Sequence, residues 1–309
     1  MGQLAESIMR ATLAAIAVLR IHAAALLVLA LGLASAQAGA QRFEQGLLWR
    51  VEGGGAAASH VFGTIHVDDP RVTELPPDAA RALDGSRSLT VELSFDQANV
   101  LALASRMVLQ DGRDLAGIVG PELFGKTAVI TARLGLPEQV LRLFKPWAAA
   151  LMLMMPQQNP ENVLDFALVR AATERGKPMY ELESVSEQVD VFEGMSEPDQ
   201  VALLKHAVAD FERMPRTIDR LVKAYLARDL AAMSSISQEG SNDSAEMRRL
   251  NDLFVQRVLD ARNVRMADRM QARLKEGGAF VAVGALHLYG SRGVLALLVQ
   301  RGWRLTRVY

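Results

Sequence analysis

The sequence contains no cysteine among its 309 residues. The chain can therefore form no disulfide, and any metal site in it must use histidine and carboxylate ligands in place of thiolates. Histidine is also scarce, with five in the whole chain, so the position of each one is informative. Hydrophobic residues make up 50% of the sequence, which is enough to build a core that stabilises the fold without cross-links.

The sequence also has no excess of charge of either sign. Its 34 lysine and arginine residues nearly balance 35 aspartate and glutamate residues, for a formal net charge of −1. Such a balance gives no electrostatic reason to expect a nucleic acid or an anionic membrane as a partner. No repeat of fixed period and no low-complexity linker is found in the sequence.

The first forty residues lack an apolar run of the roughly 20 residues that a membrane span requires. Their most apolar stretch, Ala23–Ala34, follows two arginines and precedes small-residue sites that end at Ala36 and Ala40. These features are typical of a secretory signal peptide. We therefore expect residues 1–40 to be a signal cleaved after Ala36 or Ala40, with no stable membrane anchor and a periplasmic or secreted location.

Apolar and alternating patterns predict strands near the start of the remaining chain. Residues 46–52 and 60–67 are predicted to be two strands joined by a glycine-rich turn, followed by a helix over 75–86 and a strand over 87–94. A strand, a helix and a strand in this order form a βαβ unit, and such units make parallel strand pairs.

The chain ends much as it begins. After a mostly helical middle, about 96–275, with one short strand over 177–183, we predict a strand over 278–287, a helix over 291–302 and a strand over 303–309. Because 278–287 is apolar on both alternating faces, it should be a central strand covered on both sides. The expected fold class is α/β: a mixed sheet built from the N- and C-terminal parts of the chain, with a mostly helical central insertion, in a single domain over 41–309.

Two copies of one short motif end two of the predicted strands. Gly63 and His66 form a Gly-x-x-His motif at the end of the early strand, and Gly284 and His287 form a second one at the end of the late strand. Ligands of open parallel sheets bind beyond the carboxyl ends of the strands, where both histidines would project into one crevice. Glu92 ends a third strand at the same edge. The glycines lack a Cβ, so each lets a neighbouring chain or ligand approach closely.

Two neutral imidazoles and a carboxylate form a set that binds a divalent cation while leaving positions open for water or substrate. A water bound to zinc can have its pKa lowered from about 15.7 to roughly 7, which supplies hydroxide at neutral pH. The simpler interpretations remain open: each histidine as a hydrogen-bonded structural residue, and Glu92 as a salt-bridge partner at a strand end.

Other polar residues have two interpretations each. Arg262, predicted on the helix before the late strand, could stabilise an oxyanion or pair with a carboxylate. Glu183 and Glu187 could line the cleft, although Ser184 with Glu187 also fits a helix-capping box. Asp68 and Asp69 could orient the His66 imidazole or simply belong to the turn before Pro70.

Three further features are predicted to lie outside the site. His60 begins its strand, about 20 Å from His66 at ~3.3 Å per residue, so it is not expected to be a ligand. His206 lies in a long helical pattern and is expected on the surface or in packing. The methionine-rich stretch Leu151–Met155 is predicted to be core, with a flexible groove wall as the alternative.

The residues that carry these motifs resemble the TraB/GumN family, to which the Tiki membrane metalloproteases of animals are related. The matching stretches are "VFGTIHVDDPRVTELPPDAARALDGSRSLTVELS" and "RNVRMADRMQARLKEGGAFVAVGALHLYGSRGVLALLVQRGWRLTRV". The resemblance implies a sheet related to erythromycin-esterase-like and ChaN-like proteins, with a helical segment between two halves. One departure is "HLYGSRG", where many relatives have a proline and a glutamate, so the loop beside His287 differs from theirs.

The resemblance also implies a chemistry. It makes His66 and His287 ligands of a divalent metal cation, manganese, cobalt or zinc, and it makes Glu92 either a ligand or the general base. The implied function is an exported metal-dependent hydrolase that cleaves a peptide or another amide or ester bond. The alternative is a non-catalytic periplasmic protein that binds or sequesters a peptide in the same crevice. A third interpretation is metal-free chemistry with a histidine–glutamate pair as the general base.

Overall fold

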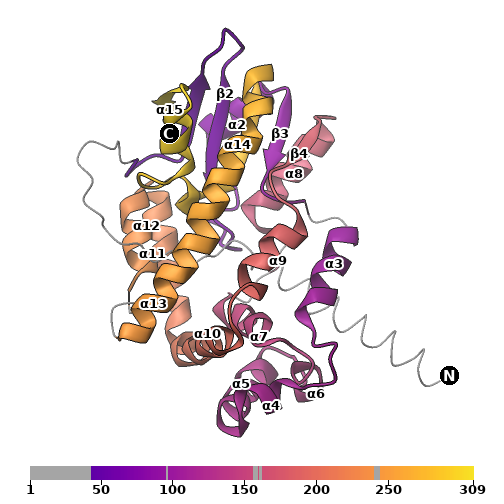
Figure 1. Cartoon of the computed structure of the whole chain (residues 1–309). Coiled ribbons are helices and arrows are strands. Elements are labelled where there is room, and N and C mark those ends of the chain that lie inside the picture. The colour runs from indigo at the N-terminus through magenta and orange to yellow at the C-terminus, as the bar shows by residue number, and fades with distance from the viewer. Residues whose placement is uncertain (1–42, 95–96, 156–158, 160–161, 240–243) are drawn as a thin grey trace, which may run out of the picture. The chain divides into compact units, whose positions relative to one another are not determined.

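The computed structural model describes residues 43–94, 97–155, 159, 162–239 and 244–309 (Figure 1). The predicted signal peptide lies outside these described residues. Within them, no helix combines the length and the apolar character that a membrane crossing requires. The described chain divides into two compact units, one formed by residues 94–160 and 184–216, the other by 43–93, 161–183 and 217–309.

The second unit contains a mixed sheet of six strands in the order β4-β3-β5-β2-β1-β6. The strands are β1 (Leu48–Glu52), β2 (Ser59–Thr64), β3 (Ser88–Val91), β4 (Met179–Glu181), β5 (Ala279–Gly284) and β6 (Arg304–Arg307). β1 runs antiparallel to both of its neighbours, whereas β2, β5, β3 and β4 run parallel to one another. The predicted α/β class and the pairing of strands from both ends of the chain are confirmed.

The predicted βαβ unit needs one correction. β2 and β3 are parallel, as expected, but they are not adjacent, because β5 pairs with both of them and lies between. All six residues of β5 are buried, which agrees with its prediction as the central strand. A strand that is apolar on both faces is best stabilised where helices can cover it on both sides.

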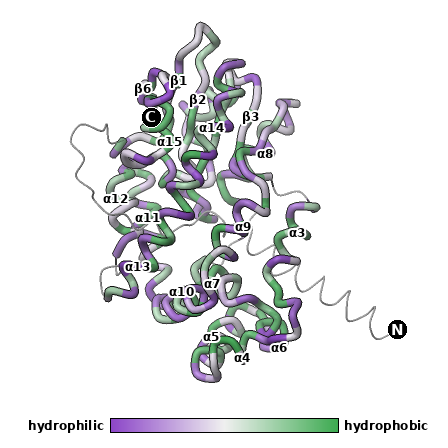
Figure 2. Tube along the Cα trace, in the orientation of Figure 1, coloured by the Kyte–Doolittle hydropathy of each residue, from purple (hydrophilic) through white to green (hydrophobic). Residues whose placement is uncertain are grey.

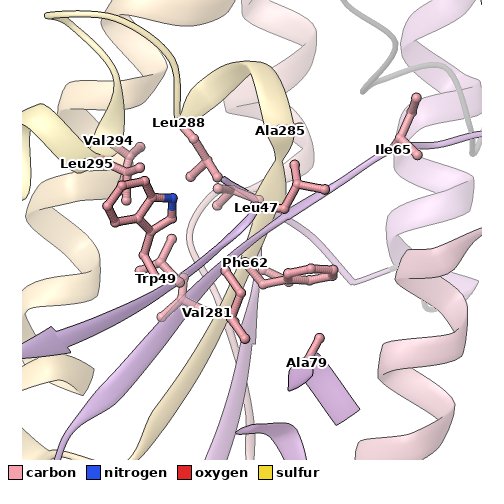
Figure 3. Packing of buried hydrophobic residues seen from close by; sticks show 14 of the residues in the cluster. Leu47, Trp49, Phe62, Ile65, Ala79, Val281, Ala285, Leu288, Val294 and Leu295 are labelled. Carbon is pink, nitrogen blue, oxygen red and sulfur yellow. The ribbon is translucent and has the colours of Figure 1, made fainter. Parts of the chain in front are cut away.

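Helices cover both faces of this sheet. The helices that contribute to the same hydrophobic core are α2 (Pro77–Asp84), α8 (Leu164–Glu174), α12 (Leu230–Ser237), α14 (Ala261–Glu276) and α15 (Val294–Gln300). The unit also contains α13 (Ala245–Phe254), the π-helical turn Val255–Asp260 and the 3₁₀ turn Ala285–His287. Figure 3 shows Trp49 pointing toward Val294 and Leu295 of α15, and Phe62 on the side of Ala79 of α2. Hydrophilic and hydrophobic residues alternate along α14 (Figure 2), which buries Met266, Met270 and Leu274 against the sheet.

The first unit is helical in its described residues. Its helices are α3 (Gln97–Met107), α4 (Leu115–Val119), α5 (Pro121–Arg133), α6 (Glu138–Leu141), α7 (Pro146–Met154), α9 (Val185–Glu193), α10 (Glu197–Asp210) and the 3₁₀ turn Phe211–Arg213; α11 (Met214–Leu226) crosses the boundary between the units. Every residue of α7 is buried, and Trp147 stacks on Phe192 of α9 with 5.7 Å between ring centroids. The prediction that Leu151–Met155 is core is confirmed.

The mostly helical middle is interrupted between α6 and α7. Pro146 lacks an N–H and disfavours helical backbone at Lys145, which is extended. The helical middle, 96–275, is shared between the two compact units. Its description as an insertion in a single domain stays a prediction.

Candidate functional site

The two motif histidines lie just beyond the ends of two adjacent parallel strands. β2 ends at Thr64, which pairs with Gly284 at the end of β5. His66 follows β2 in a loop, and His287 closes the 3₁₀ turn that follows β5. Both strands therefore end earlier than predicted, and both imidazoles are buried, with 2% and 3% of each residue exposed. The structure brings the motif histidines to the same edge of the sheet.

Glu92 joins them from the neighbouring strand. It directly follows β3 and is buried. Its Oε1 accepts a hydrogen bond of 2.6 Å from the backbone N–H of Gly284 and lies 3.8 Å from Nε2 of His287. Three adjacent strands, β3, β5 and β2, thus supply Glu92, His287 and His66 to one place, as the sequence predicts.

The two motif glycines have different surroundings. A Cβ on Gly284 would lie 3.4 Å from Oε1 of Glu92, 3.5 Å from Cδ2 of His287 and 3.8 Å from Nε2 of His66. The missing side chain of Gly284 therefore leaves a space lined by the three site residues. A Cβ on Gly63 would instead meet Leu288 at 2.8 Å and the Ala285 backbone at 3.0 Å. Gly63 allows close packing of β2 on the turn after β5, and it does not line the site.

Each imidazole has a polar partner at its Nδ1 atom. Nδ1 of His66 lies 2.7 Å from Oδ2 of Asp165 in the first turn of α8. Nδ1 of His287 lies 2.6 Å from Oδ1 of Asn263. The Asn263 amide donates through Nδ2 to the carbonyl oxygen of Arg292 at 3.0 Å. This hydrogen bond orients the amide so that Oδ1 of Asn263 faces the imidazole of His287. Because that oxygen only accepts, Nδ1 of His287 carries the proton and Nε2 keeps its lone pair.

Arg262 pairs with two buried carboxylates. Its Nη2 donates to Oε2 of Glu92 at 2.6 Å and to Oε2 of Glu183 at 2.6 Å, and its Nε donates to Glu183 at 2.8 Å. Arg265 also reaches Glu183, at 3.1 Å. Of the two interpretations of Arg262, the structure contains the carboxylate pairing. Glu92 is likewise a salt-bridge partner at a strand end, and Glu183 anchors the arginine.

Burial and charge set the protonation of the site. Burial lowers the pKa of His287 well below its ordinary value, and the nearby positive charge of Arg262 lowers it further, so the imidazole is neutral. Burial also raises the pKa of Glu92, against the opposing effect of Arg262. A neutral imidazole beside a carboxylate with a raised pKa suits metal ligation or proton transfer.

The donor chemistry fits a divalent cation, although the described part of the chain contains no closed set of ligands. Among the residues that the structure describes, no three histidine, aspartate or glutamate side chains are grouped as a metal site. Both oxygens of Glu92 already accept hydrogen bonds, but a carboxylate oxygen has two lone pairs, so Oε1 can serve Gly284 and a cation together. The ligand set His66, His287 and Glu92 stays a prediction.

The remaining candidate residues lie elsewhere. Glu187 forms a capping box with Ser184 at the start of α9, as the alternative interpretation predicts. Asp69 pairs with exposed Arg71, and Asp68 accepts a hydrogen bond from Asn162 at 3.2 Å.

Two other histidines lie outside the site. His60 is at the opposite end of β2, paired with Arg50 of β1, where burial lowers its pKa. His206 lies on α10 in the other unit.

Comparison with known proteins places the chain in a family. The sequence pattern of the TraB/PrgY/gumN family matches residues 47–307. The chain belongs to this family. This chain is 23% identical to uncharacterized protein YbaP of Escherichia coli (strain K12) over 247 residues. The match covers 77% of this chain and 87% of YbaP. No solved structure matches it significantly.

Animal metalloproteases are also similar to this TraB/PrgY/gumN chain. Metalloprotease TIKI2 of Danio rerio is 24% identical over 297 residues, covering 79% of this chain and 57% of TIKI2. Metalloprotease TIKI1 of Homo sapiens is 22% identical over 303 residues, covering 79% of this chain and 59% of TIKI1. The chain thus corresponds to little more than half the length of these animal proteins.

Sequence reasoning missed the residues that hold the imidazoles. Asp165 replaces Asp68 and Asp69 as the carboxylate beside His66, although it lies much farther along the chain. A signal was available: Asp165 is an acidic residue between the apolar residues of "VLDFAL". Asn263, next to Arg262, lies within the stretch that resembles the family, but its contact with His287 depends on the fold.

Proposed function

We propose that this protein is an exported metal-dependent hydrolase that cleaves a peptide or another amide or ester bond. One observation carries the proposal: two buried imidazoles from paired Gly-x-x-His motifs and one carboxylate surround the space that Gly284 leaves open. The similarity to proteins named metalloproteases supports a hydrolase. Export through residues 1–40, into the periplasm or the medium, is part of the same proposal.

The residues that would hold the metal are His66, His287 and Glu92. Nε2 of each histidine and Oε1 of Glu92 are the donor atoms, and manganese, cobalt or zinc would suit them. When bound, such a cation would polarise the scissile carbonyl and lower the pKa of water. A sheet related to erythromycin-esterase-like and ChaN-like proteins, with a helical insertion, belongs to the proposal as well.

The chain's own residues would prepare this site. Asn263 orients the imidazole of His287, and burial keeps it neutral. Arg262, anchored by Glu183, holds the carboxylate of Glu92 at the space beside Gly284. In that position Glu92 is either a metal ligand or the group that accepts a proton from water.

A non-catalytic peptide-binding protein is the second candidate. It is favoured by the hydrogen bonds that already occupy both carboxylate oxygens of Glu92 and by the lack of a closed group of three ligands among the described residues. Such a protein would use the same crevice for binding without turnover.

A peptide-cleavage experiment separates the two functions. The protein loaded with Mn²⁺, Co²⁺ or Zn²⁺ is incubated with a peptide library, and fragments are followed by mass spectrometry. The hydrolase predicts fragments with the wild type and with His206→Ala, a matched histidine variant in the other unit, but none with His287→Ala. Saturable binding of peptides without fragments from the wild type would favour the binding protein.

A further inference from the structure

The Nδ1 atoms of the two site histidines face different groups: a carboxylate oxygen of Asp165 at 2.7 Å from His66, and the amide oxygen of Asn263, which is hydrogen-bonded to His287. We propose that Asp165 is a positioning residue that holds His66 as its Nδ1–H tautomer, with Nε2 directed to the space beside Gly284. The inference rests on the proposed function, because it concerns how that site is prepared for its ligand. A carboxylate behind a ligating imidazole fixes the ring and raises its basicity.

The fold holds the Asp165 carboxylate in place from two sides. The hydroxyl of Thr64, the last residue of β2, donates to Oδ1 at 3.0 Å. Asp165 also lies in the first turn of α8, after the N-cap Val163, where the helix dipole favours a negative charge. The other oxygen, Oδ2, faces Nδ1 of His66 at 2.7 Å. Because a carboxylate accepts hydrogen bonds, this close contact favours the His66 tautomer that carries its proton on Nδ1.

The same logic applies to the second histidine, which strengthens the inference. Asn263 presents an acceptor oxygen to Nδ1 of His287, because its amide nitrogen is committed to the carbonyl of Arg292. In these tautomers the Nε2 atom of each imidazole carries a lone pair and no proton. Since a Cβ on Gly284 would lie 3.8 Å from Nε2 of His66 and 3.5 Å from Cδ2 of His287, the two rings border one space. A metal cation coordinated by two imidazole nitrogens fits this arrangement.

A purely structural role for Asp165 makes a different prediction. If Asp165 only favoured the start of α8, its removal would lower the stability of the chain slightly and would leave the tautomer of His66 unchanged. The test therefore needs a readout of the imidazole itself.

The first measurement is the tautomer of His66 in the metal-free full chain. ¹⁵N NMR of histidine-labelled protein at about pH 8, above the ordinary histidine pKa of roughly 6.5, distinguishes Nδ1–H from Nε2–H, with His66→Ala to assign the signal. We expect Nδ1–H in the wild type and in Asp69→Ala, a control that removes a nearby carboxylate paired with Arg71. In Asp165→Ala we expect a mixture or the Nε2–H form, with His287 unchanged. An Nε2–H signal from wild-type His66, or an Nδ1–H signal retained by His66 in Asp165→Ala, would overturn the inference.

The second measurement is the affinity for Zn²⁺ and Mn²⁺, determined by competition with a chelator. We expect Asp165→Ala to weaken binding by about 10–100-fold, and Asp165→Asn, which keeps an acceptor oxygen, to weaken it less. Equal affinity in the wild type and Asp165→Ala would contradict the positioning role. If the wild type binds no divalent metal, the proposed function fails, and the tautomer measurement alone decides the role of Asp165. Should Asp165→Ala fail to fold, Asp165→Asn decides by the same comparison.

Discussion

The two motif glycines show how residues with the same spacing can have different roles. Gly284 leaves room for a ligand, whereas Gly63 leaves room for Leu288 and Ala285. Both were predicted from the sequence to allow a close approach, and the structure identifies what approaches each one. The two positions therefore make a matched pair for mutation.

The Gly284→Ala and Gly63→Ala variants should separate binding from stability. The Gly284→Ala methyl group meets only ordinary van der Waals contacts of 3.4 Å or more, so the free energy of unfolding should change little while metal and peptide binding are lost. Gly63→Ala should destabilise the protein by about 1–3 kcal/mol through overpacking. Urea unfolding and metal analysis of both variants check this. Normal metal content in Gly284→Ala would contradict the assigned space.

Tyr225 provides a pH-dependent test of packing at the end of β2. Its hydroxyl donates to the carbonyl oxygen of Gly63 at 2.9 Å, and burial raises its pKa well above the ordinary value of 10. The folded chain therefore keeps a proton that the unfolded chain loses above about pH 10. The contribution of Tyr225 is fully present below that pH and is lost as the pH rises, by up to ~1.4 kcal/mol per pH unit.

The Tyr225→Phe variant measures this contribution. We expect it to be less stable than the wild type by about 0.5–1.5 kcal/mol near pH 8, from the lost hydrogen bond. The difference should shrink above about pH 10, because only the wild type has this hydroxyl to deprotonate. Urea unfolding of both proteins across this range gives the two curves. A difference that stays constant with pH would contradict the burial of a neutral hydroxyl.

At the scale of elements, a buried network of charges links α14 to β3 and β4. Arg262 on α14 binds Glu92, which follows β3, and Glu183, which follows β4. Leu182 and Glu183 also donate backbone hydrogen bonds to Val91 and Glu92. The elements that carry the site are therefore fixed to one another by ion pairs as well as by packing.

Replacement of Arg262 should lower the free energy of unfolding substantially. Arg262→Met leaves two buried carboxylates without their main partner, and we expect a loss of about 3–5 kcal/mol. Arg301→Met, which removes a partly exposed pair with Asp268 in the same unit, should cost about 0–1 kcal/mol. Chemical unfolding of both variants tests the contrast. Similar losses in the two variants would mean that the network contributes little.

The elements themselves were largely predictable, because their patterns are local. Alternation in 87–94 and the apolar run in 278–287 predicted β3 and β5, and the helix expected over 75–86 corresponds to α2. The order of the strands was not predictable, because β5 enters between β2 and β3 through a pairing between distant parts of the chain. Pro146 accounts for the break before α7, because proline disfavours helical backbone at the residue that precedes it.

At the scale of the whole molecule, the sequence predicted that both ends of the chain build one sheet. From it follows the prediction that His66, Glu92 and His287 lie close together, and in the structure they do. The partners of these residues, Asp165 and Glu183 above all, could not be predicted, since ordinary acidic residues become partners only when the fold brings them to the site. Export and metal dependence stay proposals for experiment.

The central claim is that the two motif histidines hold one divalent metal ion. Elemental analysis of the purified protein, with circular dichroism to confirm folding, tests it most directly. We predict about one ion per chain in the wild type and in His206→Ala, and none in the His66→Ala, His287→Ala double variant. Stoichiometric metal retained by a folded double variant would contradict the claim.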